Sequence, residues 1–120
     1  MSEKVSINND LKEVNILLRK NIIKEKTISS LYKYIFKKNG KQLRARLSLI
    51  SSSVDRRQGK KRYKLAAIIE LLHNATLVHD DVVDDSPSRR GVKSVNNIWT
   101  NAHGVLIGDY IYSKAFMLMV

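Results

Sequence analysis

Carboxylates gather in one short segment of this chain, LVHDDVVDDSPSRRG, which spans residues 77–91. Asp80, Asp81 and Asp84 have the spacing D-D-x-x-D, so on a helix Asp80 and Asp84 lie one turn apart on the same face. Two carboxylates there repel each other, and near the C-terminal end of a helix they also oppose the helix dipole. Mg²⁺ reverses both effects, and it typically binds one or two carboxylates together with substrate phosphates. The pattern predicts a Mg²⁺ site at Asp80 and Asp84 that bridges to a phosphorylated ligand; the alternative is a solvated acidic helix end.

Two arginines, Arg89 and Arg90, follow the carboxylates directly. Guanidinium groups form paired hydrogen bonds with phosphate oxygens. A single site could therefore bind a diphosphate, with the metal on some of the diphosphate oxygens and the arginines on the others. The alternative is that these arginines simply neutralise the aspartates.

Helical periodicity accounts for almost the whole chain, and we find no persuasive strand. Asp10 is a candidate N-cap of the first helix, and Asn39-Gly40 is a turn signal after the second. The segment SPSRRGVK, residues 86–93, holds the only proline and is expected to be a loop. The predicted class is all-α, with helices at residues 10–25, 27–38, 42–52, 63 to 84 or 85, 94–101 and 103–120.

Composition limits the class of protein. The chain has 120 residues, one domain's worth at most, and no cysteine, which excludes disulfide and thiol chemistry. The polar beginning is not a signal peptide and no apolar run would span a bilayer, so we expect a cytoplasmic protein without a transmembrane segment. The 22 Lys and Arg against 11 Asp and Glu permit a basic nucleic-acid-binding module. The acidic cluster and the lack of a recognisable reading helix disfavour that alternative.

The last predicted helix, HGVLIGDYIYSKAFMLMV, is apolar on most sides. A helix of this kind is expected to be buried among neighbours. We therefore expect residues 1–120 to be an incomplete fold, cut on its C-terminal side or completed by another chain.

Four ordered segments resemble one known family, the trans-isoprenyl (polyprenyl) diphosphate synthases. HDDVVDDSPSRRG resembles the first aspartate-rich motif of that family, and ELLHNATLVHDD the helix that leads into it. NGKQLRARL resembles the upstream glycine-lysine segment, and GVLIGDYIYSKAFMLM the following helix of the octaprenyl-type branch. The resemblance covers roughly residues 31–120, and four motifs in order are far more specific than D-D-x-x-D alone.

The resemblance implies the N-terminal half of an isoprenoid synthase helical bundle, with residues 1–120 as the N-terminal portion of a synthase domain. It implies that isopentenyl diphosphate is condensed onto an allylic diphosphate, with Mg²⁺ on Asp80 and Asp84 and with Asp81 in support. By position, Arg89 matches the arginine that binds the allylic diphosphate. The residues that match the isopentenyl diphosphate site are Lys41, Arg44, His73 and Arg90.

Two further expectations concern the product and the state of the chain. Ala75, about a turn before Asp80, is small, which favours a long-chain product; a packed helix is the other explanation for a small residue there. Family members are more than twice as long and carry a second aspartate-rich motif, which this sequence lacks. We therefore expect a homodimer or completion by another chain, and we keep a non-catalytic remnant or partner subunit as the alternative function.

Overall fold

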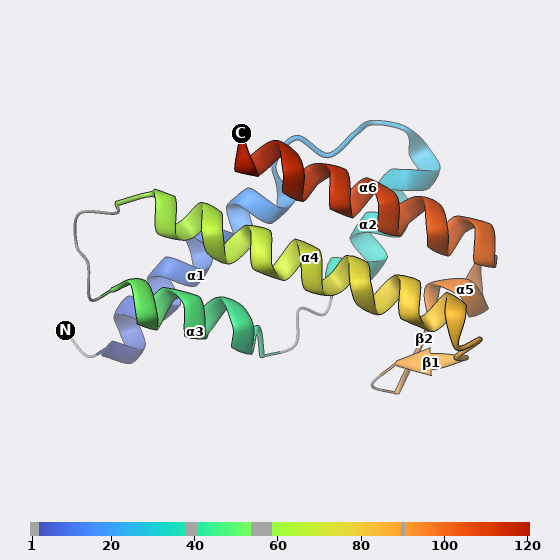
Figure 1. Ribbon diagram of the computed structural model, residues 1–120, viewed down its shortest axis with the longest axis horizontal. Helices are drawn as coiled ribbons and strands as arrows, with labels where there is room; N and C mark the ends of the chain where they lie inside the picture. Colours follow the sequence, from blue (N-terminus) through green and yellow to red (C-terminus); the bar gives the residue numbers. More distant parts are fainter. Residues whose placement is uncertain (1–2, 38–40, 54–58, 90) are drawn as a thin grey trace.

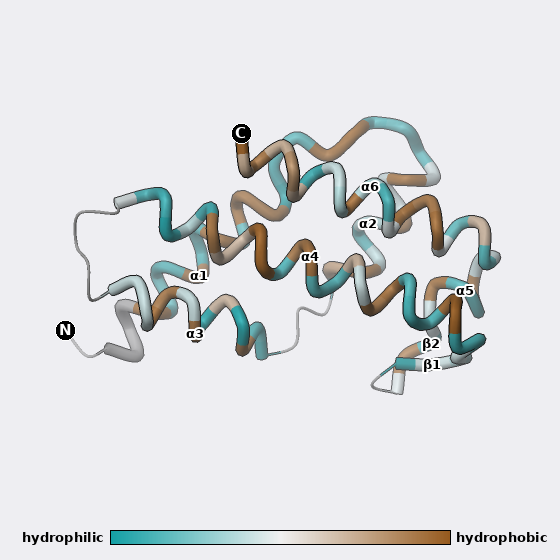
Figure 2. Tube along the Cα trace, viewed as in Figure 1, coloured by the Kyte–Doolittle hydropathy of each residue, from teal (hydrophilic) through white to brown (hydrophobic). Residues whose placement is uncertain are grey.

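Helix α4 (Lys61–Val83) is the axis around which the other elements pack (Figure 1). One side of this 23-residue helix is apolar and buried, through Ala66, Leu71, Ala75 and Val78 among others. Helix α6 (Asn101–Met119) runs beside it, and α3 (Leu43–Ser52) and α1 (Glu3–Arg19) contact its first half. Figure 2 shows that apolar and polar residues alternate along α4, as expected for a helix that buries one side.

The structure is a computed structural model that describes residues 3–37, 41–53, 59–89 and 91–120. The all-α class is confirmed. The remaining elements of these ranges are α2 (Lys26–Phe36), β1 (Ser88–Arg89), β2 (Val92–Lys93) and α5 (Val95–Ile98). The predicted turn signal at Asn39-Gly40 lies outside the described residues. None of the helices in the described part of the chain is long and apolar enough to cross a membrane.

The loop expected at residues 86–93 contains a small antiparallel hairpin instead. Strand β1 pairs with β2 in the register Ser88 to Lys93 and Arg89 to Val92, around Gly91, whose φ is +76°. Strands of two residues are too short for an alternating pattern, so they could not be predicted from periodicity. The hairpin matters because it carries Arg89 back toward α4.

Asp10 is not an N-cap, because α1 begins seven residues earlier, at Glu3. Its carboxylate is buried and accepts paired hydrogen bonds from Arg62 at 2.8 and 2.9 Å, and another from the hydroxyl of Tyr63 at 3.0 Å. The hydrogen bond to Asp10 is the main reason that the pKa of Arg62 is raised. This network joins α1 to the first turn of α4.

Replacing Asp10 with alanine should lower the free energy of unfolding by about 2–4 kcal/mol, because Arg62 would keep a half-buried charge without its partner. Urea denaturation measures this loss. The double variant Asp10→Leu/Arg62→Met should be less destabilised than the single one. Equal losses would show that the pairing itself contributes nothing.

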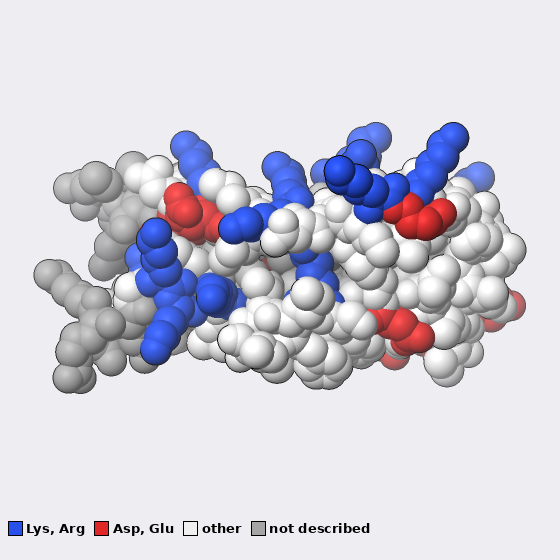
Figure 3. All heavy atoms as spheres, turned by 90° about the horizontal axis from the view of Figure 1, so that it is seen from above, with Lys and Arg blue, Asp and Glu red and all other residues white. Residues whose placement is uncertain are grey.

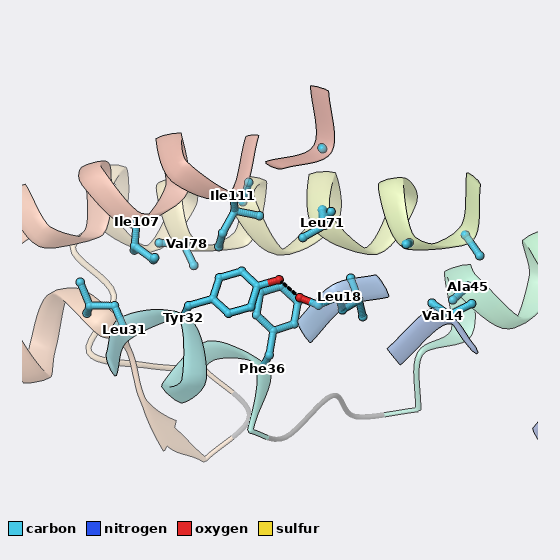
Figure 4. Close-up of a cluster of buried hydrophobic side chains, with 14 of the residues drawn as sticks. Val14, Leu18, Leu31, Tyr32, Phe36, Ala45, Leu71, Val78, Ile107 and Ile111 are labelled. Carbon is cyan, nitrogen blue, oxygen red and sulfur yellow. Dashed lines mark hydrogen bonds between the residues drawn. The ribbon is translucent and has the colours of Figure 1, made fainter. Parts of the chain in front are cut away.

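Tyr32 stands at the centre of the core (Figure 4). Its ring stacks on Phe36 with centroids 4.5 Å apart, and its hydroxyl donates to the carbonyl oxygen of Leu18 at the end of α1. Burial raises the pKa of Tyr32. The buried ammonium of Lys114 on α6 donates to the carbonyl oxygen of Lys20, and burial lowers its pKa. A carbonyl in the last turn of α1 and one just after the helix therefore accept hydrogen bonds from side chains of α2 and α6.

Two glycines let α6 approach α4. A methyl group at Gly104 would lie 2.6 Å from Cγ2 of Val82, and one at Gly108 would collide with the imidazole of His79. Gly108→Ala should therefore destabilise the fold by about 1–3 kcal/mol through overpacking. In a His79→Ala background the same change should stabilise it by up to about 1 kcal/mol, since alanine favours helix. Thermal unfolding of the four chains tests this reversal of sign.

Candidate functional site

Five of the predicted site residues line a single cavity of about 690 Å³. Its walls come from α2, the start of α3, the middle of α4 and the hairpin. The five residues are Lys41, Arg44, His73, Asp81 and Arg89. Residues as far apart in the sequence as Lys41 and Arg89 therefore face one space.

Arg44 and His73 lie in contact with each other in the wall of this cavity. The guanidinium nitrogen Nη1 of Arg44 lies 3.1 Å from Nε2 of His73, although the residues belong to different helices. Such a contact directs two nitrogen-bearing groups from α3 and α4 toward the same volume. Lys41, two residues before α3 begins, adds an exposed ammonium at the rim. A cation pair with an adjacent imidazole suits a phosphate or diphosphate.

The start of α3 is held by contacts that the sequence did not reveal. Gln42 precedes the helix in a left-handed conformation, with φ +51°, and its amide donates to Oδ1 of Asn15 on α1 at 2.8 Å. The guanidinium Nε of Arg46 donates to the carbonyl oxygen of Lys41 at 2.7 Å. Glu70 on α4 accepts from the backbone N–H of Ala45 at 3.1 Å. These contacts fix the backbone between Lys41 and Arg44.

Asp81 and Arg89 form a paired ion bridge at the other end of the cavity. Nη2 of Arg89 donates to Oδ1 of Asp81 at 2.8 Å, and Nε donates to Oδ2 at 3.1 Å. The geometry follows from the end of α4, where Asp85 is left-handed and the N–H of Ser86 bonds back to the carbonyl of Asp81. That turn sends the hairpin back along α4. Asp81 is thus a buried partner that fixes the position of Arg89, whereas its predicted role in support of Mg²⁺ stays a prediction.

Asp80 and Asp84 are exposed at the last turn of α4 and do not line the cavity. Within the described ranges neither carboxylate has a hydrogen bond or ion pair, and no three acidic, histidine or cysteine side chains form a metal-binding group. Two accessible carboxylates one turn apart fit Mg²⁺, which takes its other ligands from phosphates and water. They lie close enough to Arg89 for their charges to raise its pKa, after the larger effect of its hydrogen bond to Asp81.

Arg90, the remaining predicted site residue, lies outside the described residues.

Comparisons with known proteins identify the family of the chain. The sequence profile of the polyprenyl synthetase family matches residues 25–120. Octaprenyl diphosphate synthase of Escherichia coli (strain K12) is 41% identical over 92 residues, which make up 77% of this chain and 28% of the relative. The chain thus spans less than a third of that relative's length.

Solved structures extend the likeness to the fold. A decaprenyl diphosphate synthase from Rhodobacter capsulatus has a TM-score of 0.88 at 37% identity, over 96% of this chain and 36% of that one. A polyprenyl synthase from Caulobacter crescentus CB15, complexed with calcium and isoprenyl diphosphate, has a TM-score of 0.89 at 34% identity, over 96% and 35%. The fold is that of the all-α isoprenyl synthases. The chain belongs to the polyprenyl synthetase family.

Proposed function

We propose that the cavity and the neighbouring aspartates form the substrate-binding part of a Mg²⁺-dependent trans-prenyltransferase that makes a polyprenyl diphosphate. The observation that carries this proposal is the convergence of Lys41, Arg44 and His73 on one cavity whose far end is Arg89. The family membership and the names of the relatives support the reaction type. The calcium in the Caulobacter complex supports a divalent cation, and the choice of Mg²⁺ is ours.

The two diphosphates would occupy different parts of the site. Isopentenyl diphosphate would lie against Lys41, Arg44 and His73, with Arg90 as a further predicted ligand. The allylic diphosphate would lie beside Arg89 and the carboxylates of Asp80 and Asp84. When bound there, Mg²⁺ would neutralise charge on the departing diphosphate.

Bond changes follow from this placement. The carbon–oxygen bond of the allylic diphosphate breaks, and pyrophosphate leaves with the electron pair. The double bond of isopentenyl diphosphate would attack the allylic carbon, and the proton whose loss restores a double bond would pass to the departing pyrophosphate. Arg89, fixed by Asp81, would hold positive charge at the leaving group without reorganisation.

The long-chain product stays a prediction. Ala75 is fully buried in α4, and the hydroxyl of the next residue, Thr76, lies 2.9 Å from the hydroxyl of Tyr112 on α6. The octaprenyl and decaprenyl synthases among the relatives support a long chain. The cytoplasmic location also stays a prediction.

Completion by another chain or by a second copy is proposed from exposed apolar side chains. Leu43, Leu47 and Ile50 are 65%, 66% and 52% exposed and recur on one face of α3. Phe116 and Met117 on α6 are 57% and 78% exposed. Surfaces of this kind favour a binding partner, and they equally suit the alternative of a non-catalytic partner subunit.

The basic charge does not favour the nucleic-acid alternative. Lys and Arg side chains are spread along the length of the face seen in Figure 3 rather than gathered in one patch, with acidic side chains among them. A nucleic-acid surface is expected to be a continuous basic stripe.

The test is to incubate the purified chain with Mg²⁺, farnesyl diphosphate and labelled isopentenyl diphosphate, and to look for extended prenyl products. Product would establish turnover by this chain. No product, together with Mg²⁺-dependent binding of the diphosphates, would favour the partner subunit. Salt-sensitive binding of DNA without any diphosphate binding would overturn the proposal.

A further inference from the structure

Glu70 is a buried carboxylate of α4 that takes no part in the proposed binding of the two substrates. It is 5% exposed, lies in the middle of α4 and lines the same cavity as Arg44 and His73. Its Oε1 accepts a hydrogen bond of 3.1 Å from the backbone N–H of Ala45. Ala45 follows Arg44 directly, and it belongs to the first turn of α3.

Among the described residues, no side chain just before α3 caps its first turn. The first N–H groups of a helix have no partner within the helix, and a side chain just before it normally accepts from one of them. Gln42 occupies that place but makes no capping hydrogen bond, and its amide group is directed to Asn15 on α1. The cap of Ala45 is therefore supplied from another helix, by Glu70, 25 residues away.

Glu70 and His73 are three residues apart on α4, so one turn of that helix makes both contacts with α3. The carboxylate holds the backbone at Ala45, and the imidazole lies 3.1 Å from the guanidinium of Arg44. A carboxylate is well suited to the first contact because it forms a strong hydrogen bond to N–H and complements the positive end of a helix dipole. The two contacts together set the rotation and height of α3 against α4.

We propose that Glu70 is a positioning residue for the diphosphate site: it fixes the start of α3 so that Arg44 faces His73 across the cavity. The inference rests on the proposed function, because it requires the cavity to bind a diphosphate. It predicts that Glu70 acts on the ligand through Arg44 and not by contact of its own.

The experiment measures inorganic pyrophosphate binding in the presence of Mg²⁺ by titration calorimetry, for the wild-type chain, Glu70→Ala, Glu70→Gln, Arg44→Ala and the double variant Glu70→Ala/Arg44→Ala. Glu70→Ala should weaken binding about 10- to 100-fold, and Glu70→Gln, which keeps an acceptor oxygen, less than about 10-fold. In the Arg44→Ala background, Glu70→Ala should have little further effect, because neighbours that act as a unit are not additive. Glu13→Gln, which removes an exposed carboxylate of α1, should bind as the wild type does.

Hydrogen exchange of the Ala45 amide provides a second readout. Exchange should be faster in Glu70→Ala than in the wild type, and it should change less in Glu70→Gln. If the alanine variant is unstable, the glutamine variant is compared with the wild type in its place. Wild-type affinity in a Glu70→Ala chain with a fast-exchanging Ala45 amide would overturn the inference alone. The inference would also be overturned if Glu70→Ala lowered the affinity for pyrophosphate equally in the wild-type and Arg44→Ala backgrounds. A wild-type chain that does not bind pyrophosphate would overturn the proposed function and the inference with it.

Discussion

Replacing Asp80 and Asp84 together with asparagine should abolish the stabilisation of this chain by pyrophosphate and Mg²⁺. A ligand at 100 times its dissociation constant stabilises the native state by about 2.7 kcal/mol, which for a chain of this size corresponds to a rise in Tm of about 10 °C. Asparagine keeps the shape of both side chains but removes the charges that attract a divalent cation. Because both carboxylates are exposed and unpaired within the described ranges, the fold itself should be unaffected. Thermal unfolding with pyrophosphate, with and without Mg²⁺, measures the effect.

A matched control removes two exposed carboxylates elsewhere. Asp85→Asn/Glu13→Gln has the same net charge as the test variant, and asparagine tolerates the left-handed backbone at position 85, where φ is +51°. This control should keep the full Mg²⁺-dependent rise in Tm. If both variants lost the rise equally, the effect would reflect net charge and the metal site would be placed wrongly.

The sequence was informative where structure is local. Sequence pattern predicted α4 and α6, although α6, which is apolar on most sides, buries only one stripe of its residues and leaves Phe116 and Met117 exposed. It misplaced the start of α1 because Asp10 has the chemistry of an N-cap, and only its contact with Arg62, 52 residues away, shows why a carboxylate lies in the middle of the helix. The hairpin was missed because its pairing involves two residues on each side.

Some residues of the candidate site could be predicted from local spacing, and others could not. The spacing of Asp80 and Asp84 identified a pair of neighbouring carboxylates, since i and i+4 residues share a helix face. Lys41, Arg44 and His73 came from the family resemblance, and the cavity supports their grouping. The anchoring of Arg89 by Asp81 depends on the left-handed turn at Asp85.

Glu70 begins the segment ELLHNATLVHDD, but its position there did not indicate a role for it. Its partner is a backbone N–H of another helix, and a pattern of side chains does not reveal a backbone contact across 25 residues. Only the packing of α3 against α4 could identify it.

The second large effect is expected at the other end of the cavity. Lys41→Ala/Arg44→Ala should weaken binding of isopentenyl diphosphate by at least about 100-fold, because each charge-assisted hydrogen bond to a phosphate contributes about 1.5–3 kcal/mol. Arg44 contributes a fork of donors beside His73, and Lys41 an exposed ammonium at the rim. Calorimetric titration at physiological ionic strength measures the dissociation constant.

A control variant separates the effect of net charge on binding from the effect of direct contacts. Lys60→Ala/Lys61→Ala removes two exposed cations at the beginning of α4, far along the helix from His73, and lowers the net charge by the same amount. Long-range attraction to a diphosphate is screened within about 8 Å at physiological salt, so this control should bind as the wild type does. Equal weakening in both variants would mean that the cations act only through their summed field. A loss confined to Lys41→Ala/Arg44→Ala would show that isopentenyl diphosphate binds by direct contacts in the cavity. Its site would then be separate from the carboxylates at the end of α4.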